Sequence, residues 1–417
     1  MCSARKAREH SFSMRRVAIT GLGIICGLGK CVDEYWQGLV EGRSAIQPIQ
    51  AVDTSCLRFH TGAEVRNYDP AQYFDDTQQK FLDRFAQFAV IAAREAISNA
   101  HLTITPALSS RIGVVVGSSV GGQSSEDAGF QEIYLRGQTR VHPLTIPKAM
   151  MNAGASQICM EMGITGPAFT TATACSSANH AIGLAFWMVR SGQVELAISG
   201  GSEAPFSFGL LKAWEAMRVV SADSCRPFSK DRSGLILGEG GAMLVLEPLD
   251  RALARGATIY GEITGFGMSA DAHHITQPAP DGPARAMQNA LADGDVEAAS
   301  VGYINAHGTG TISNDATETR AIRHAFGSHA DQALVSSTKS MHGHALGAAG
   351  AIEAVATVLA LHHGIIPPTI NYTAPDSECN LNLVVNRPQA ASVDCALSNS
   401  FAFGGLNAVL AFRAWKP

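Results

Sequence analysis

Short runs of β-branched and apolar residues alternate along the chain with longer runs in which apolar residues recur every three to four positions. The short runs predict buried strands, and the long runs predict amphipathic helices. Their alternation predicts βαβ crossovers and an α/β fold with sheets covered on both faces. The expected strands are 16–20, 112–116, 195–199, 242–247, 259–265, 303–306, 334–337 and 408–412. The expected helices are 81–100, 177–191, 283–293, 316–326 and 345–363.

Two glycine-rich segments far apart in the sequence resemble each other. Residues 234–248 read GLILGEGGAMLVLEP, and residues 398–415 read SNSFAFGGLNAVLAFRAW. Each reads as a strand, a Gly-Gly turn and a second apolar strand, and each closes a block with one long Ala/Gly-rich helix. We therefore expect a duplicated fold with halves 14–255 and 256–417, in which both helix N-termini point to a common centre. Chance similarity of two glycine-rich hairpins is the alternative.

Composition excludes several classes of protein. The 417 residues are 46% hydrophobic and 16% charged, and the net charge of −5 gives no global positive field for nucleic acid or an anionic membrane. Nine cysteines without a Cys-x-x-Cys pair argue against a zinc site or a disulfide framework and favour a reducing cytoplasm. No run of about 18 apolar residues is evident, so we expect no membrane span. Residues 1–13 are polar and basic and predict a disordered leader.

The segment FTTATACSSANHAIGLAFWMVRSG, residues 169–192, places Cys175 between small residues and a helix with apolar periodicity. A cysteine at the turn into a helix lies at the positive end of the helix dipole, which favours the thiolate. Backbone N–H groups in such a turn can also bind a developing oxyanion. Cys175 is therefore a candidate nucleophile, although a lone buried cysteine is more often a small hydrophobic residue.

The segment YINAHGTGTISNDATETRAI, residues 303–322, runs from a strand into His307 and a glycine-rich turn. A histidine at the end of a buried strand can point into a cleft, where Thr309 and Thr311 can donate hydrogen bonds to a polar chain. Asp315 and Glu318 open the next helix. Both are candidates for supporting acids in the site, and N-terminal capping together with complementation of the helix dipole is the alternative.

The segment SSTKSMHGHALGAAGAIEAVATVLALHHG, residues 336–364, brings Lys339 from a strand and His344 from a glycine turn to a tightly packed Gly/Ala helix. A lysine among such small residues needs an acidic partner, for which Glu318 and Glu353 are the candidates. His342 and His344 compete for a functional role, and we prefer His344 because it opens the helix.

The segment SNSFAFGGLNA, residues 398–408, places two phenylalanines before a Gly-Gly turn. Exposed backbone N–H groups around Phe403 and Gly404 can supply a second oxyanion donor. The side chain of Phe403 can cover the nucleophile as a movable plug.

Together these segments resemble the β-ketoacyl-acyl-carrier-protein synthase I/II family. The resemblance covers nearly the whole chain and includes, in order, VAITGLG, TACSSA, RPFSKDRSGLILGEGG, NAHGTGT, STKSMHGHALGAAGA and NSFAFGG. The segment LLKAWEAMRV followed by CRPFS is similar to the nodulation-factor and aryl-polyene branch. The resemblance implies the five-layered αβαβα thiolase fold, usually as a homodimer.

The family's functional residues fall on particular positions of this sequence. The nucleophile, the two histidines, the lysine and the gate fall on Cys175, His307, His344, Lys339 and Phe403. The resemblance implies that the cysteine takes an acyl group from an acyl carrier protein. A malonyl carrier, whose phosphopantetheine passes Thr309 and Thr311, then loses CO₂ and condenses with that acyl group. No metal or organic cofactor is implied, although some family members hold a structural monovalent cation.

Departures from the family pattern leave the acyl chain open. Val120 and Trp214 match positions of the acyl pocket, and Trp214 stands where many members have Phe. Leu406 stands where the family commonly has Thr. Ala402 stands where it commonly has Gly beside the gate, which should stiffen that loop.

The resemblance predicts an acidic carrier protein as the partner, which needs a basic landing site. The matching basic positions are Lys80, Arg140 and Arg218, with Arg84 nearby, whereas two further family-basic positions hold Thr77 and Phe81. The predicted patch is therefore thin, and ordinary solvated charges are the alternative interpretation.

Several alternatives share parts of this pattern. A chain-length-factor subunit has the fold without the cysteine, and a thiolase uses a second cysteine in a Cys-x-Gly context that Cys379 and Cys395 lack. A cysteine hydrolase would release free acid instead of forming a carbon–carbon bond. A specialised type II polyketide or aryl-polyene ketosynthase, in a heterodimer with a chain-length-factor partner, is the alternative to a fatty-acid type homodimer.

Overall fold

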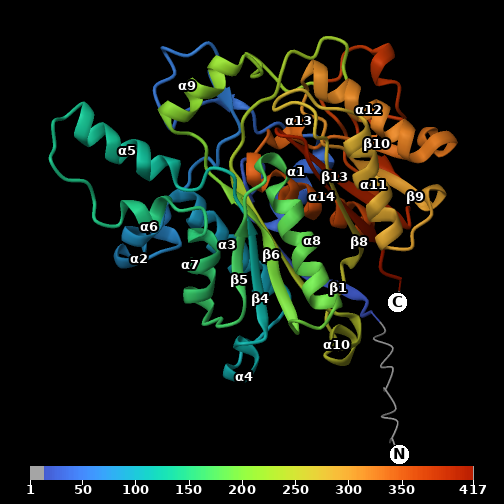
Figure 1. Cartoon of the computed structure of the whole chain (residues 1–417), viewed down its shortest axis with the longest axis horizontal. Coiled ribbons are helices and arrows are strands. Elements are labelled where there is room, and N and C mark those ends of the chain that lie inside the picture. Colours follow the sequence, from blue (N-terminus) through green and yellow to red (C-terminus); the bar gives the residue numbers. More distant parts are fainter. Residues whose placement is uncertain (1–13, 417) are drawn as a thin grey trace, which may run out of the picture.

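The computed structural model describes residues 14–416, so the leader predicted for residues 1–13 lies outside it. Ten strands form one mixed sheet in the order β10-β9-β13-β14-β8-β1-β7-β6-β4-β5 (Figure 1). The first half contributes β1 (Val17–Cys26), β4 (Ile112–Gly117), β5 (Ala168–Thr171), β6 (Leu196–Glu203) and β7 (Gly240–Pro248). The second half contributes β8 (Gly261–Ala270), β9 (Val301–Asn305), β10 (Leu334–Ser336), β13 (Cys395–Ala402) and β14 (Leu406–Arg413).

The strand order repeats on either side of the contact between β1 and β8. In the first half, β7 is antiparallel to β1 and β6, and β4 and β5 continue the sheet in parallel. In the second half, β14 is antiparallel to β8 and β13, and β9 and β10 continue in parallel. The expected duplication is therefore confirmed. The two sheet halves meet only through residues 17–19 and 261–263, and the division of the chain at 255/256 stays a prediction.

Helices cover both faces of each sheet half and give five layers. One outer layer is α3 (Arg84–Asn99) on β1, β6 and β7, and the other is α11 (Asp281–Asp293) on β8 and β14, with α12 (Ile312–Phe326) beside it. Between the halves lie α8 (Ser177–Arg190) and α14 (Ala349–His363), which contact strands of both. The other helices are α1 (Val32–Glu41), α2 (Asp76–Phe81), α4 (Pro106–Ser109), α5 (Gln123–Tyr134), α6 (Thr145–Ala149), α7 (Ala153–Met162), α9 (Phe208–Met217), α10 (Leu249–Ala254) and α13 (Lys339–His342).

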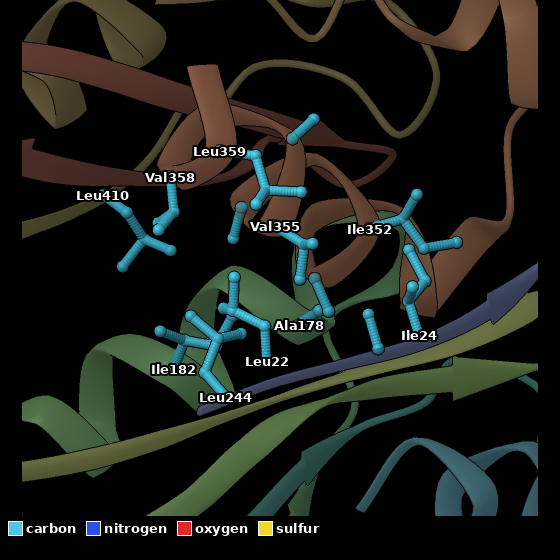
Figure 2. Close-up of a cluster of buried hydrophobic side chains, with 14 of the residues drawn as sticks. Leu22, Ile24, Ala178, Ile182, Leu244, Ile352, Val355, Val358, Leu359 and Leu410 are labelled. Atoms are coloured by element: carbon cyan, nitrogen blue, oxygen red, sulfur yellow. The ribbon is translucent and has the colours of Figure 1, made fainter. Parts of the chain in front are cut away.

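Alternating side chains of the strands fill the layers. Along β7, Leu244 points into the central layer, whereas Met243 packs towards α3. The central layer joins Leu244 to Ile182 on α8 and Val355 on α14 (Figure 2). Among residues 14–416, Leu346–His363 is the one helical stretch long and apolar enough to cross a membrane by length and composition alone, although it includes Glu353 and two histidines. Within the described residues it is 89% buried, because α14 is the core helix between the two sheet halves.

Every strand and helix expected from the pattern is present, but one hairpin prediction is wrong. Residues 234–238 do not form a strand paired with β7. Leu235 and Leu237 instead make single bridges to Val220 and His344. The reason is that β6 already occupies the edge of β7 that such a hairpin would need.

Candidate active site

Cys175 lies in the 3₁₀ turn Ala174–Ser176 (η2), between β5 and the first residue of α8. Ala174 has a φ of +50°, a left-handed conformation that bends the chain sharply before the cysteine. Cys175 is buried and lines a cavity. Since α8 begins two residues later, its N-terminal peptide dipoles lie close to the sulfur.

Cys175, His307 and His344 meet in this cavity. The sulfur and one ring nitrogen of each histidine all lie within 4.8 Å of one another. The two imidazole rings are 5.4 Å apart between centroids and nearly perpendicular, at 86°. His307 follows β9, and His344 lies between α13 and α14. The halves of the fold therefore contribute one thiol and two imidazoles to a single site.

Lys339 fixes the protonation of His307. Its ammonium is fully buried, forms an ion pair with Glu353, and donates to the backbone oxygen of His307 at 2.7 Å. The same nitrogen lies 3.3 Å from His307 Nδ1. An ammonium has only protons to donate, so Nδ1 accepts and the imidazole proton resides on Nε2. Of the two acidic partners expected for Lys339, the structure selects Glu353 and not Glu318.

His344 is held in the same tautomer by a different contact. Its Nδ1 accepts a hydrogen bond from the backbone N–H of Leu346 at 3.1 Å, which leaves the proton on Nε2. Within residues 14–416, that Nε2 is buried and has no hydrogen-bond partner. Burial and the charge of Lys339 hold the pKa of both His307 and His344 well below the ordinary range. Both rings are therefore neutral N–H donors.

The thiol of Cys175 is protonated at rest. Burial raises its pKa to about 11, although the charge of Lys339 and the backbone N–H groups of Phe403 and Cys175 itself act in the opposite direction. The expectation that the helix position favours the thiolate is thus outweighed by desolvation. The two amides nevertheless point donors at the position where charge develops on or near the sulfur.

The acidic residues predicted to support the site bind its backbone and not the histidine rings. Glu318 accepts from the N–H groups of His307 at 2.8 Å and Gly308 at 2.7 Å. Asp315 accepts from the N–H groups of Phe228 at 2.8 Å and Gly310 at 3.2 Å. Thr311 and not Asp315 is the N-cap of α12, but Asp315 lies in the first turn of that helix, so the dipole complementation named in the alternative is met. Both carboxylates shape the loop after β9.

The cavity has a volume of about 250 Å³ and runs from Cys175 to the surface. Thr309 and Thr311 line it, and their hydroxyls are 2.9 Å apart. Trp214 and Arg218 also line it. The wall formed by residues 274–278 was not expected from the sequence, and its histidine and proline content gave no periodic signal.

Phe403 lies over the cavity and stacks on Trp214, with centroids 6.1 Å apart. Val120 belongs to the same apolar cluster as both aromatic rings, although it does not line the cavity. The prediction of Gly404 as an oxyanion donor is wrong, because its N–H already donates to the backbone oxygen of Ile275 at 2.7 Å. Its φ of +82° instead lets the chain turn between β13 and β14.

The predicted basic residues do not form one patch around the cavity. Arg218 lies at its mouth, at the C-terminal end of α9, whereas Lys80 on α2 and Arg140 between α5 and α6 do not line it. Figure 1 shows α9 and α2 on different sides of α5 and α6. Arg84 is paired with the buried Glu239 at 2.6 Å.

Three buried oxygen atoms, from β9, β13 and α14, fit the donor set of a hard monovalent cation. Within the described residues, Asn305 Oδ1, Glu353 Oε2 and Ser398 Oγ have no hydrogen-bond partner. Asn305 and Ser398 are register partners on β9 and β13, and the Asn305 amide donates to the backbone oxygen of Glu353. Uncharged and carboxylate oxygens are the ligands that hard cations take.

The arrangement of the thiol, the two imidazoles and the lysine indicates a class of protein. A buried thiol at a helix N-terminus, facing two neutral imidazole N–H donors, suits acyl transfer through a cysteine thioester and stabilisation of an enolate. A thiol and two imidazoles can also bind zinc. The ammonium of Lys339 beside His307 disfavours a second positive charge there.

The chain belongs to the β-ketoacyl synthase family. Residues 14–252 match the family model "Beta-ketoacyl synthase, N-terminal domain", and residues 260–373 match "Beta-ketoacyl synthase, C-terminal domain". The chain is 48% identical over 399 residues to "Nodulation protein E" of Rhizobium sp. (strain N33), covering 96% of this chain and 99% of that one. It is 46% identical over 412 residues to "3-oxoacyl-[acyl-carrier-protein] synthase 2" of Synechocystis sp., with the same coverage.

Solved structures agree with this assignment. The ishigamide ketosynthase/chain length factor superposes with a TM-score of 0.93 at 37% identity, covering 97% of this chain and 100% of that one. A type II polyketide ketosynthase solved with its acyl-carrier protein superposes with a TM-score of 0.88 at 28% identity and the same coverage. The protein is thus an acyl-transferring condensing enzyme with the thiolase-like fold.

Proposed function

We propose that this ketosynthase holds an acyl chain on Cys175 and extends it with malonyl units delivered by an acyl carrier protein. The observation that supports this most directly is that one ring nitrogen of His307 and one of His344 lie within 4.8 Å of the Cys175 sulfur, in rings that both carry their proton on Nε2. Two neutral donors suit an oxygen that becomes negative during decarboxylation. A general base would need an unprotonated nitrogen facing the cavity.

Acyl loading forms one thioester and breaks another. The sulfur of Cys175 attacks the acyl carbonyl of the incoming thioester, and its proton passes to the departing carrier thiolate. The amide N–H groups of Cys175 and Phe403 are the proposed donors to the tetrahedral oxyanion, because both already lower the pKa of the thiol. Removal of one such donor costs on the order of 10²–10³ in rate.

Condensation begins when the malonyl C–CO₂⁻ bond breaks and CO₂ leaves. The electron pair moves into an enolate whose oxygen accepts hydrogen bonds from His307 and His344. The enolate carbon then attacks the acyl carbonyl, and collapse expels the Cys175 thiolate, which regains a proton from water. Lys339 keeps the proton on His307 Nε2. A monovalent cation, bound at Asn305, Glu353 and Ser398, would offset buried negative charge behind the lysine.

The carrier's phosphopantetheine is proposed to enter along Thr309 and Thr311. Around the mouth, Arg218 offers one positive charge, while Ile275 and Ile312 are 70% and 66% exposed. An acidic carrier would therefore dock partly through apolar contact. Lys80 and Arg140 do not line the cavity, so they would join the docking surface only if the carrier covers residues beyond its mouth.

A homodimer is the proposed assembly. The edge strand β5 leaves Phe169 exposed, and exposed apolar side chains on α5 and α6 include Tyr134 and Ile146. Pairing of two β5 edges would cover unpaired backbone groups. A heterodimer with a chain-length-factor sister subunit would use the same edge.

The cytoplasm is the proposed location of the protein. The eight described cysteines are all free, which favours a reducing compartment.

One reconstitution tests the reaction and the histidine roles together. The purified protein is incubated with acyl- and malonyl-carrier protein, and β-ketoacyl product, CO₂ and free acid are measured. We expect product and CO₂ in equal amounts, whereas free acid alone would identify a hydrolase. In His344→Ala, Cys175 should acylate normally while condensation falls on the order of 10²–10³-fold. Normal condensation by that variant would refute its assigned role.

A further inference from the structure

Glu203, the last residue of β6, is a fully buried carboxylate that was not expected from the sequence. All six of its hydrogen-bond donors within the described chain are neutral. They are Ser118 Oγ at 2.9 Å, Ser119 N at 2.7 Å, Ser119 Oγ at 2.6 Å, Val120 N at 3.3 Å, Gly121 N at 3.2 Å and Gly347 N at 3.1 Å. Hydrogen bonds to an ionised acceptor are about twice as strong as neutral ones.

These donors come from two segments with different tasks. Residues 118–121 follow β4 and carry Val120, which packs in the apolar cluster with Trp214 and Phe403. The other segment is the turn before α14, where Gly347 follows directly on Leu346, whose N–H orients His344. A Cβ on Gly347 would lie 2.5 Å from Glu203 Oε2, so the turn rests directly on the carboxylate.

We propose that Glu203 is a positioning residue that couples the acyl-chain pocket to His344. The inference rests on the proposed condensing function and deepens it. One anion holds the loop of Val120 and the turn of His344 at a fixed separation. The shape of the acyl pocket and the placement of an enolate donor are therefore set together.

The charge of Glu203 gives a readout that a purely structural role would not move. Burial is the main cause that raises the pKa of Cys175, and the negative charge of Glu203 adds a smaller contribution in the same direction. A neutral replacement should lower that pKa, so the rate of Cys175 alkylation should rise at a given pH below the wild-type value. A loosened fold alone would change accessibility at every pH without moving the midpoint.

The test is Glu203→Gln in the full-length protein. The Gln amide nitrogen cannot accept hydrogen bonds, so part of the donor set loses its acceptor. We expect a broader range of product chain lengths, a loss of malonyl decarboxylation on the order of tenfold, and a lower midpoint for iodoacetamide alkylation. Glu247→Gln is the matched control. Glu247 is equally buried and lies near the end of the neighbouring strand β7 that is remote from Glu203, where it is hydrogen-bonded to Thr20 and Arg255. This variant should change stability alone.

The outcomes are separable. Failure of the wild type to condense refutes the proposed function itself. A condensing wild type together with a Glu203→Gln variant of unchanged chain-length range, decarboxylation and alkylation midpoint overturns the coupling. If Glu203→Gln does not fold, Ser119→Ala decides, since it removes only one hydroxyl donor. That variant should broaden the chain-length range by a smaller amount, and an unchanged range would overturn the inference.

Discussion

The turns that open the two central helices are alike in backbone and different in side chain. Before α8, Ala174 has a φ of +50° and is followed by Cys175, and before α14, Leu346 has a φ of +46° and is followed by Gly347. Each turn is a 3₁₀ segment leading straight into the helix. The duplicated fold thus has two similar turns, of which only the one with Cys175 lines the cavity. One turn carries the nucleophile, and in the other the N–H of Leu346 orients His344 while Gly347 leaves room for Glu203.

The outermost strands of the two sheet halves, β5 and β10, hold equivalent places in the fold but differ in how far they are covered. The strand β5 ends the first half with Phe169 39% exposed. The equivalent strand β10 is covered, because Val335 exchanges backbone hydrogen bonds with Asn382 and Val384. An uncovered edge strand invites pairing with another chain. In the proposed dimer, β5 and not β10 is therefore the edge expected to pair with a second subunit.

Replacing the nucleophile should give the largest effect. Cys175→Ser keeps the turn but substitutes a hydroxyl that is far less nucleophilic than a thiol. We expect acyl-enzyme formation and condensation to fall by on the order of 10³-fold or more. Intact-mass spectrometry after incubation with acyl-carrier protein measures the adduct. Undiminished condensation by the variant, with acylation at another cysteine such as Cys225, would show that Cys175 is not the nucleophile.

Loss of the positive charge of Lys339 should have an intermediate effect. Lys339 lowers the pKa of Cys175, so Lys339→Met should raise it above about 11. Below that value the reactive thiolate fraction falls tenfold per unit of pKa increase, and alkylation at pH 8 should slow by about that factor for each unit. Lys212→Met, which removes a surface lysine paired with Glu215, is the control. If Lys339→Met alkylates at the wild-type rate, the charge of Lys339 does not lower the pKa of Cys175.

The sequence predicted most of the fold and the central trio, because periodicity and glycine turns are local signals. His307 directly follows a strand that the pattern located, whereas the strand before Cys175, β5, was not among the expected strands, and helix α13 separates His344 from the located strand β10. The sequence analysis missed Glu203 and assigned the wrong role to Gly404, and both errors have a physical reason. Glu203 depends on donors from residues 118–121 and 347, and the Gly404 amide depends on Ile275. Such long-range hydrogen bonds leave no periodic trace along the chain.

The smallest expected effect concerns the edges and leaves the chemistry within one protomer intact. Phe169→Arg places a charge on β5 where a partner strand would pair, and like charges would then oppose each other across the interface. We expect sedimentation velocity to show a shift from dimer to monomer, with acylation of Cys175 retained. Leu253→Arg is the matched control, since Leu253 on α10 is 51% exposed and lies away from that edge. If both variants remain dimeric, assembly does not use β5, and the difference between the edges needs another explanation. If Leu253→Arg alone dissociates, the interface lies on the α10 side instead.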